Sequence, residues 1–341
     1  MTPEFESLLF FLAENPDVET WKSAVPQVDE TPIRRVAFDA TLDGNLAGKG
    51  EPVVVTGALL PSVAAAANLS SLRARFGSAP ALANDRAPAR HADALEGGGG
   101  RQRTLRSTLG EYLDRHVDAA PASLEGHLAP GAQRPRQPFY LNGWRPTLAS
   151  RELLKQLSPP PALARIDQTV EIASALNDTL FRGLPKDDGR APWFGTVDES
   201  LTKLFIGPPG TITRLHYDAG DAHGWLLQVS GRKFFALYPP SATPMLHPLD
   251  TETETVQSPV DPLCPDVASW PAYAAARPRV VMLRPGEAIL VPRGWWHYAV
   301  SVDTSVTLQR NFYHAATNAR GLVQLVLQSV KRIQQQARQA T

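Results

Sequence analysis

His216-Tyr217-Asp218 is followed far downstream by the run Val291-Pro292-Arg293-Gly294-Trp295-Trp296-His297. Two histidines and one carboxylate on rigid strands can bind one face of an Fe(II) ion and leave the opposite coordination positions open. His297 lies 79 residues after Asp218, too far for a local metal-binding loop, whereas a strand-rich barrel brings such distant residues together. The pattern predicts that His216, Asp218 and His297 bind a metal and are the catalytic residues.

Strand periodicity selects this pair among three His-x-Asp matches, the others being His91-Ala92-Asp93 and His116-Val117-Asp118. Residues i and i+2 share a face in a strand, but they diverge by roughly 200° in a helix. His116 follows apolar residues at helical spacing, and His91 lies in a stretch that ends in four glycines. Residues 204–215 instead predict a strand, a Pro-Pro-Gly turn and a second strand that leads into His216.

The context of the second histidine is also that of a strand. Residues 288–292 predict a buried strand that ends at a proline, Arg293-Gly294 predicts a turn, and residues 295–300 predict the next strand. Taken alone, His297 also fits a surface histidine flanked by aromatic residues. The combination with His216 and Asp218 favours the metal ligand.

These motifs resemble those of the JmjC and cupin-like Fe(II)/2-oxoglutarate oxygenases, especially the small hydroxylases related to the asparaginyl hydroxylase that inhibits hypoxia-inducible factor. The resemblance covers about residues 52–313 and is closest at 204–240 and 281–313. It implies a mainly β fold with flanking helices and a double-stranded β-helix (jelly roll) core. Residues 52–57 look like the family's first strand, and residues 193–195 like the segment before the first metal strand.

Lys233 is the candidate cation for the co-substrate 2-oxoglutarate. It shares a predicted strand face with Phe235 and Leu237, and a lysine on an apolar face needs an anionic partner. The alternative is a solvated lysine near a hairpin turn. The resemblance adds three further residues that would bind the co-substrate: Thr213, Tyr140 and Asn311.

The chain departs from the family pattern near the expected substrate mouth. Gly224 stands where relatives carry asparagine, so one polar contact to the co-substrate or substrate is either lost or supplied by the adjacent His223. Arg214 stands where relatives often have proline. The polar, proline-rich segment 247–277 is expected to cover this mouth. The expected substrate residues are Arg214, His223, Trp295 and Trp296.

Three regions are predicted along the chain: an N-terminal helix and lead-in segment (1–50), the jelly-roll catalytic domain (51–314) and a C-terminal amphipathic helix (315–341). Within the catalytic domain, residues 61–120 are expected to be mainly helical, 150–157 a short helix and 169–182 irregular. The C-terminal helix has apolar residues at i, i+3 and i+4 spacing. It either packs on its own barrel or forms a homodimer interface.

Composition limits the partners and the compartment. A chain of 341 residues with 43% hydrophobic content can bury a sizeable core. Its 34 basic and 34 acidic side chains give a net charge of zero, which argues against nucleic-acid binding through overall positive charge. One cysteine fits the reducing cytoplasm, and the apolar run at residues 8–13 is too short to span a membrane.

The function predicted from these features is that of a 2-oxoglutarate-dependent dioxygenase using Fe(II), 2-oxoglutarate and O₂. It would hydroxylate a C–H bond of a protein side chain or small molecule and release succinate and CO₂. Demethylation of an N-methyl group runs by the same chemistry and stays open. The alternatives are a cupin-type metalloprotein with other chemistry and a non-catalytic cupin-like binding module; Lys233 and the intact set of three metal ligands argue against them.

Overall fold

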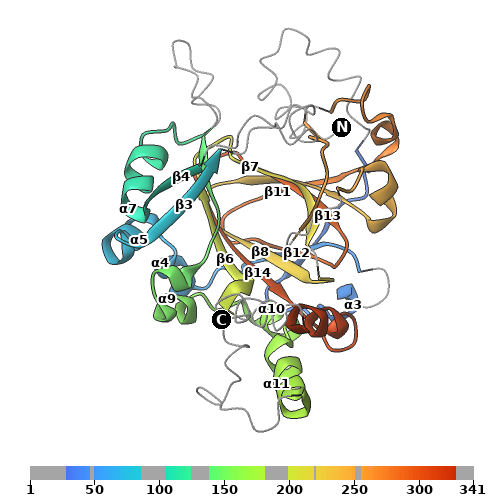
Figure 1. Cartoon of the computed structure of the whole chain (residues 1–341), viewed down its shortest axis with the longest axis horizontal. Helices are drawn as coiled ribbons and strands as arrows, with labels where there is room; N and C mark the ends of the chain where they lie inside the picture. The colour runs from blue at the N-terminus through green and yellow to red at the C-terminus, as the bar shows by residue number, and fades with distance from the viewer. Residues whose placement is uncertain are drawn as a thin grey trace, which may run out of the picture.

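A computed structural model of the chain describes residues 28–46, 50–85, 104–123, 138–180, 199–218, 220–249, 255–263 and 265–327. These residues form two β-sheets that face each other, with helices and turns packed on the outside (Figure 1). The predicted mainly β jelly-roll class is therefore confirmed.

The larger sheet has nine strands, which follow one another across the sheet in the order β1 (Arg34–Ala37), β2 (Val53–Thr56), β12 (Ala288–Val291), β8 (His223–Ser230), β14 (Ser305–Phe312), β6 (Thr202–Gly207), β5 (Phe139–Trp144), β3 (Pro80–Asp85) and β4 (Thr104–Thr108). The smaller sheet has five strands, in the order β10 (Thr255–Gln257), β7 (Ile212–Asp218), β13 (Trp296–Ser301), β9 (Lys233–Tyr238) and β11 (Arg279–Leu283).

Short helices connect these strands: α3 (Asp43–Leu46), α4 (Pro61–Ala66), α5 (Leu69–Phe76), α7 (Leu109–Tyr112), η1 (Leu113–Val117), η2 (Pro146–Leu148), α9 (Arg151–Gln156), α10 (Pro161–Ile166), α11 (Thr169–Leu180), η3 (Pro240–Met245) and η4 (Pro271–Ala275). The expected short helix at 150–157 is confirmed as α9, which Ser150 caps by accepting a hydrogen bond from the Glu152 backbone N–H.

Strand alternation separates two environments on the nine-stranded sheet. On β14, Val306 and Leu308 belong to the apolar cluster that the outer helices cover, so Thr307 and Gln309 point inward. The space between the sheets holds a separate apolar cluster that includes Phe235, Leu237 and Ile289. The inner face of β14 is therefore the polar side of the barrel interior, and the cluster with Phe235, Leu237 and Ile289 fills the apolar side.

Three expectations about the surrounding segments need correction. The described part of residues 61–120 contains the expected helices α4, α5, α7 and η1, but it also contains β3 and β4, which pair as a hairpin. The alanines of β3 suggest a helix by propensity, but strand pairing with β4 and β5 overrides that preference. Residues 169–180 are not irregular but form α11, which begins where the Asp167 carboxylate accepts from the Thr169 backbone N–H.

The third correction concerns the insertion at 247–277, which was expected to cover the substrate mouth. Its described residues pack largely on the outer face of the five-stranded sheet, where Val260, Leu263 and Tyr273 join one apolar cluster with Tyr238 and Tyr298. The described part of this insertion therefore covers the outer face of the five-stranded sheet through its apolar side chains. Residues 250–254 of the insertion lie outside the described part.

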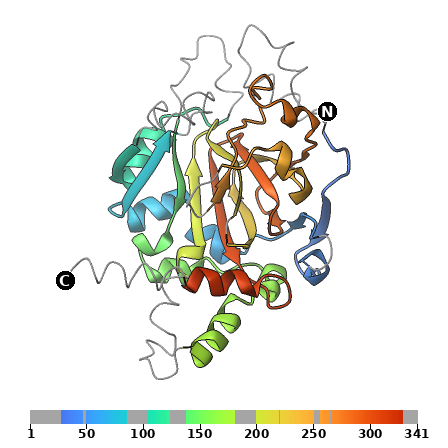
Figure 2. The same ribbon diagram turned by 45° about the vertical axis from the view of Figure 1, so that its right-hand side comes forward.

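The C-terminal helix is described over residues 319–327 and lies beside α11 (Figure 2). Leu322 and Val326 are fully buried in a cluster with Ala173 of α11 and with Tyr313. This part of the helix packs on its own chain, while a homodimer interface remains a prediction. No helix among the described residues is long and apolar enough to cross a membrane.

Several predicted features lie outside the described residues: the N-terminal helix around residues 8–13, the His91-Ala92-Asp93 pair and the segment 193–195.

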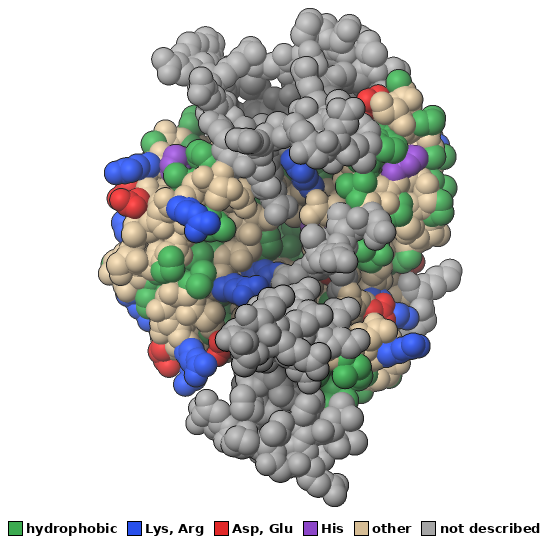
Figure 3. All heavy atoms as spheres, in the orientation of Figure 1, with side chains coloured by type: hydrophobic (Ala, Val, Ile, Leu, Met, Phe, Trp, Pro, Cys, Tyr) green, Lys and Arg blue, Asp and Glu red, His purple; other side chains and the backbone are tan. Residues whose placement is uncertain are grey.

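On the face shown in Figure 3, the Lys and Arg side chains of the described residues are dispersed among apolar and uncharged ones.

Candidate metal centre

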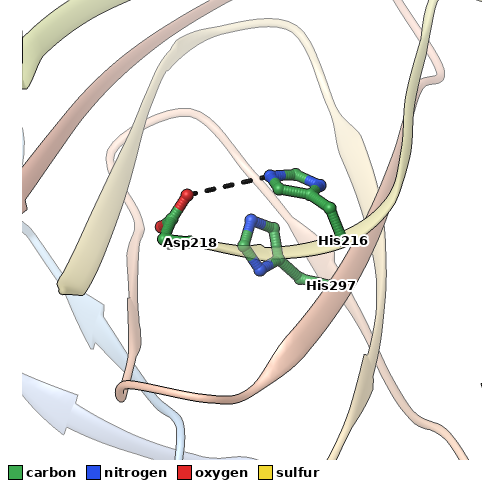
Figure 4. Close-up of side chains that lie close together, drawn as sticks. All are labelled: His216, Asp218 and His297. Atoms are coloured by element: carbon green, nitrogen blue, oxygen red, sulfur yellow. Dashed lines mark ion pairs between the residues drawn. The ribbon is translucent and has the colours of Figure 1, made fainter. Parts of the chain in front are cut away.

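His216 and Asp218 on β7 and His297 on β13 point toward one another (Figure 4). One ligand atom from each residue lies within 4.8 Å of the other two, and His216 Nε2 is 3.8 Å from Asp218 Oδ1. His216 and His297 are direct cross-strand partners, which explains their proximity. The structure therefore brings together the three residues that sequence reasoning selected.

Both histidine rings are oriented by backbone carbonyl groups. His216 Nδ1 lies 2.7 Å from the carbonyl oxygen of Arg214, and His297 Nδ1 lies 3.3 Å from that of Trp295. A carbonyl oxygen only accepts hydrogen bonds, so each Nδ1 carries the proton. Each Nε2 then keeps its lone pair for a metal, which is how protein histidines are commonly prepared as ligands.

A register shift explains why Thr213 faces the barrel interior. His297 pairs with His216, but Ala299 pairs with Thr213, so β7 has one more residue than β13 between these pairs. In a regular strand, positions 213 and 216 would point to opposite faces. The bulge restores a common face, and Thr213 is buried there.

Lys233 is buried in the same barrel and has only uncharged partners among the described residues. Its Nζ donates to the Tyr140 hydroxyl at 2.8 Å and to Thr307 Oγ1 at 3.4 Å. The Phe205 ring lies 5.3 Å from the same nitrogen. An ammonium group buried without a counter-ion is unfavourable, so this pocket suits an anion. Lys233 is only 1% exposed, so the alternative interpretation, a solvated lysine near a hairpin turn, is wrong.

Two residues of this pocket were missed by sequence reasoning. Thr307 lies on the inner face of β14 and links Lys233 to the Gln228 side chain, to which it donates at 2.9 Å. Ser301 is the cross-strand partner of Lys233, and its buried hydroxyl has no hydrogen-bond partner among the described residues. The alternation of polar residues along β14 was the available signal for Thr307. Ser301 shares a strand face with His297, but its pairing with Lys233 depends on the register of two strands.

The sequence matches the cupin-like domain family over residues 40–318. This chain belongs to the cupin-like domain family. Its curated relatives include HSPB1-associated protein 1 of Bos taurus, 39% identical over 102 residues, which are 29% of this chain and 21% of the bovine protein. Lysine-specific demethylase 8 of Xenopus tropicalis is 32% identical over 150 residues, 42% of this chain and 33% of the relative.

Jumonji C domain-containing protein 5 of Drosophila melanogaster is 32% identical over 137 residues, 38% of this chain and 34% of the relative. The matched part of this cupin-like chain thus spans about a fifth to a third of these relatives.

Two residues expected at the substrate mouth of this cupin-like barrel lie behind the metal strands. Trp296 is fully buried in the outer cluster of the five-stranded sheet, where its Nε1 donates to Thr243 Oγ1. Arg214 sits in the β7 bulge; burial lowers the pKa of its guanidinium, and neighbouring Asp261 and Tyr298 oppose that shift. Tyr298 lies on the outer face of the five-stranded sheet, so the neighbouring Arg214 also lies on that side. The expected placement of Trp296 and Arg214 at the substrate mouth is therefore wrong.

His223 also needs correction as a substrate residue, whereas the assignment of Trp295 stays a prediction. Trp295 belongs to the apolar cluster inside the barrel and donates to the backbone oxygen of Gly50. His223 is buried against Phe312 on the outer face of β8, with Nε2 bonded to Thr317 Oγ1 and Nδ1 accepting from the Arg293 backbone N–H. Both nitrogens are occupied, so His223 does not supply the polar contact that Gly224 lacks.

The environment of His223 gives a prediction about acid stability. Burial first, and then nearby Arg293 and His314, lower the pKa of His223 to about 3. In the unfolded chain the His223 side chain binds a proton near pH 6.5, whereas in the folded protein it binds one only at much lower pH. The contribution of His223 to stability should therefore be full above this range and fall as the pH drops from about 6.5 toward 3. Urea unfolding at several pH values should show this loss in the wild type and a flatter profile in His223→Gln; equal slopes in both proteins would contradict the assignment.

The second His-x-Asp pair, His116 and Asp118, contributes no atom to the metal centre. His116 lies on η1 and stacks on Tyr112, with ring centroids 5.9 Å apart, and Asp118 pairs with Arg73. His116 and Asp118 therefore have separate local partners, as the helical spacing predicted.

Proposed function

We propose that this cupin-like chain is an Fe(II)- and 2-oxoglutarate-dependent oxygenase. His216, Asp218 and His297 would hold the iron, because two neutral imidazole nitrogens and one carboxylate oxygen form the donor set of non-heme iron oxygenases. The observation that carries the proposal is the burial of Lys233 in the same barrel, four residues along β9 from the partner of His297, with no carboxylate partner among the described residues. Other cupin chemistry would have no use for a buried, unpaired cation.

The residues around Lys233 fit the distal carboxylate of 2-oxoglutarate. Lys233 Nζ, the Tyr140 hydroxyl and the buried, partnerless Ser301 hydroxyl are donors that a carboxylate can satisfy together. Thr213 is assigned to the same pocket because the β7 bulge turns it inward. Asn311 donates to Asp218 with one N–H, and its second N–H is assigned to the co-substrate.

When bound, the iron and 2-oxoglutarate would supply an oxidant for an unactivated C–H bond, with succinate and CO₂ as the other products. The work of this chain is to position those groups and to exclude water around them. The inner apolar cluster, with Phe235 and Leu237 beside Lys233, keeps one side of the pocket dry.

The substrate class that we propose is a protein side chain. The support is the name of a relative, lysine-specific demethylase 8, which gives lysine as the residue that this relative demethylates. Hydroxylation and N-demethylation differ only in whether the oxidised carbon stays on the product. Mass spectrometry of candidate protein substrates distinguishes them, because hydroxylation adds one oxygen and demethylation removes a methyl group as formaldehyde.

An anaerobic titration tests the proposal. Fe(II) plus 2-oxoglutarate should produce a weak visible charge-transfer band with the wild-type chain, because the co-substrate would chelate the iron. Admission of O₂ should then yield succinate, slowly without the prime substrate. Metal binding without a band on adding 2-oxoglutarate would favour cupin chemistry of another kind, and absence of metal binding would favour the non-catalytic module.

A further inference from the structure

The inner face of β14 carries a row of polar side chains that leads to the metal centre. Gln309 Nε2 donates to Asn311 Oδ1 at 2.8 Å, and Asn311 Nδ2 donates to Asp218 Oδ2 at 2.7 Å. Gln309 is 6% exposed and Asn311 8%, so water does not compete freely for these bonds. The two amides thus connect a residue outside the metal centre to its carboxylate.

The direction of both hydrogen bonds follows from the carboxylate. An ionised Asp218 only accepts, so Asn311 must present its amide nitrogen and turn its oxygen away. That oxygen in turn requires a donor, which the Gln309 nitrogen supplies. The orientation of each amide is therefore dictated from Asp218.

The far end of this row has an unusual feature. Gln309 Oε1 is buried and has no hydrogen-bond partner among the described residues. Leaving a buried acceptor unsatisfied is unfavourable, and such groups in native proteins call for an explanation. Reversing the Gln309 amide would place its oxygen against Asn311 Oδ1, so the unsatisfied oxygen is the consequence of orienting Asn311.

Gly224 leaves the space in which Asn311 meets Asp218. It is the cross-strand partner of Asn311 on β8, and a Cβ at this position would lie 3.2 Å from Asp218 Oδ2 and 3.7 Å from Asn311 Nδ2. A larger side chain at 224 would occupy the region of that bond.

We infer that Gln309 is a positioning residue that acts through Asn311 on Asp218. With Oδ2 held by Asn311, Asp218 presents Oδ1, the oxygen 3.8 Å from His216 Nε2, to the metal. Binding through one oxygen keeps further coordination positions open for co-substrate and O₂. This inference rests on the metal site of the proposed function.

Two variants test the role of the Gln309 amide. Gln309→Met keeps the length of the side chain but has no donor, and Gln309→Asn keeps the amide but is one methylene shorter. Both should weaken Co(II) binding about tenfold, the lower range for losing a group that supports a metal ligand. Both should also change the visible d–d spectrum of bound Co(II), because Asp218 is free to rotate. The melting temperature of metal-free Gln309→Met should change little, because the substitution removes the unsatisfied Gln309 oxygen but leaves Asn311 Oδ1 without its donor.

Gln156→Met is the matched control. Gln156 lies on α9 outside the barrel, and its side-chain oxygen accepts a hydrogen bond from Arg75, away from the metal centre and from the row on β14. This variant should bind Co(II) with wild-type affinity and spectrum.

Each other outcome overturns the inference in a recognisable way. Unchanged Co(II) affinity and spectrum in both Gln309 variants would show that Asp218 needs no such support. Weaker binding with an unchanged spectrum and a matching loss of metal-free stability would show a packing role only. A wild-type chain that binds no Co(II) would overturn the proposed function together with the inference. If Gln309→Met does not fold, Gln309→Asn decides by the same two readouts.

Discussion

Replacing His297 by alanine is expected to lower the affinity for Fe(II) by at least about 100-fold, because losing a group that merely supports a ligand already costs roughly 10- to 100-fold. His297 is buried, its Nε2 is left free by the bond of Nδ1 to Trp295 O, and it lies across from His216. Anaerobic titration with Fe(II), followed by equilibrium dialysis, measures the change. Succinate formation should fall to the level of a metal-free sample.

His116→Ala is the matched control for this variant. His116 belongs to the other described His-x-Asp pair, but its ring contacts Tyr112 and Phe139 and contributes no atom to the metal centre. This variant should keep wild-type Fe(II) affinity. If His116→Ala lost the metal as well, or if His297→Ala kept it, the assignment of the three ligands would be wrong.

Replacing Lys233 by methionine is expected to weaken 2-oxoglutarate binding by about 3–5 kcal/mol, the range for removing one partner of a buried ion pair. This corresponds to more than about 100-fold in the concentration needed for half-maximal turnover. The stability of the protein without co-substrate should stay equal or rise, because Lys233 is then a buried cation whose hydrogen-bond partners are uncharged. Urea unfolding without co-substrate and the charge-transfer titration measure the two effects separately.

Arg232→Met provides the comparison from the neighbouring position. Arg232 points away from the barrel and pairs with Asp303 at 2.8 Å. Its loss should leave 2-oxoglutarate affinity unchanged. An unaltered affinity in Lys233→Met would exclude Lys233 as the co-substrate cation, whereas an equal loss in both variants would point to a general effect of charge.

The selection of His216 and Asp218 shows how much of the metal centre could be predicted. Residues i and i+2 share a face in a strand, and proline and glycine turns mark the strands that contain the ligands. The same rule excludes His116, because a helical residue diverges from its i+2 neighbour. It also selects Lys233, which shares the inner face of β9 with Phe235 and Leu237.

The substrate residues could not be predicted in this way. Trp296 follows directly from the strand that contains His297, but adjacent strand residues face opposite sides, so a ligand at 297 sends Trp296 to the outer cluster. Arg214 was expected at the mouth because it stands where relatives often have proline, but it lies in the bulge on β7, next to Tyr298 of the outer face. His223 depends on contacts with Thr317 and the Arg293 backbone, both far away in the chain.

The sequence by itself determined the three candidate ligands and the buried lysine, because each depends on periodicity over a few residues. The class of fold followed from the resemblance of its motifs to the cupin-like oxygenases. The tertiary structure decided what depends on strand pairing: the inward turn of Thr213 at the bulge, the partnership of Ser301 with Lys233, and the two amide hydrogen bonds from Gln309 through Asn311 to Asp218. Pairing register is a property of two strands at once, and a one-residue shift moves a side chain to the other face. A single segment of sequence therefore does not contain that information.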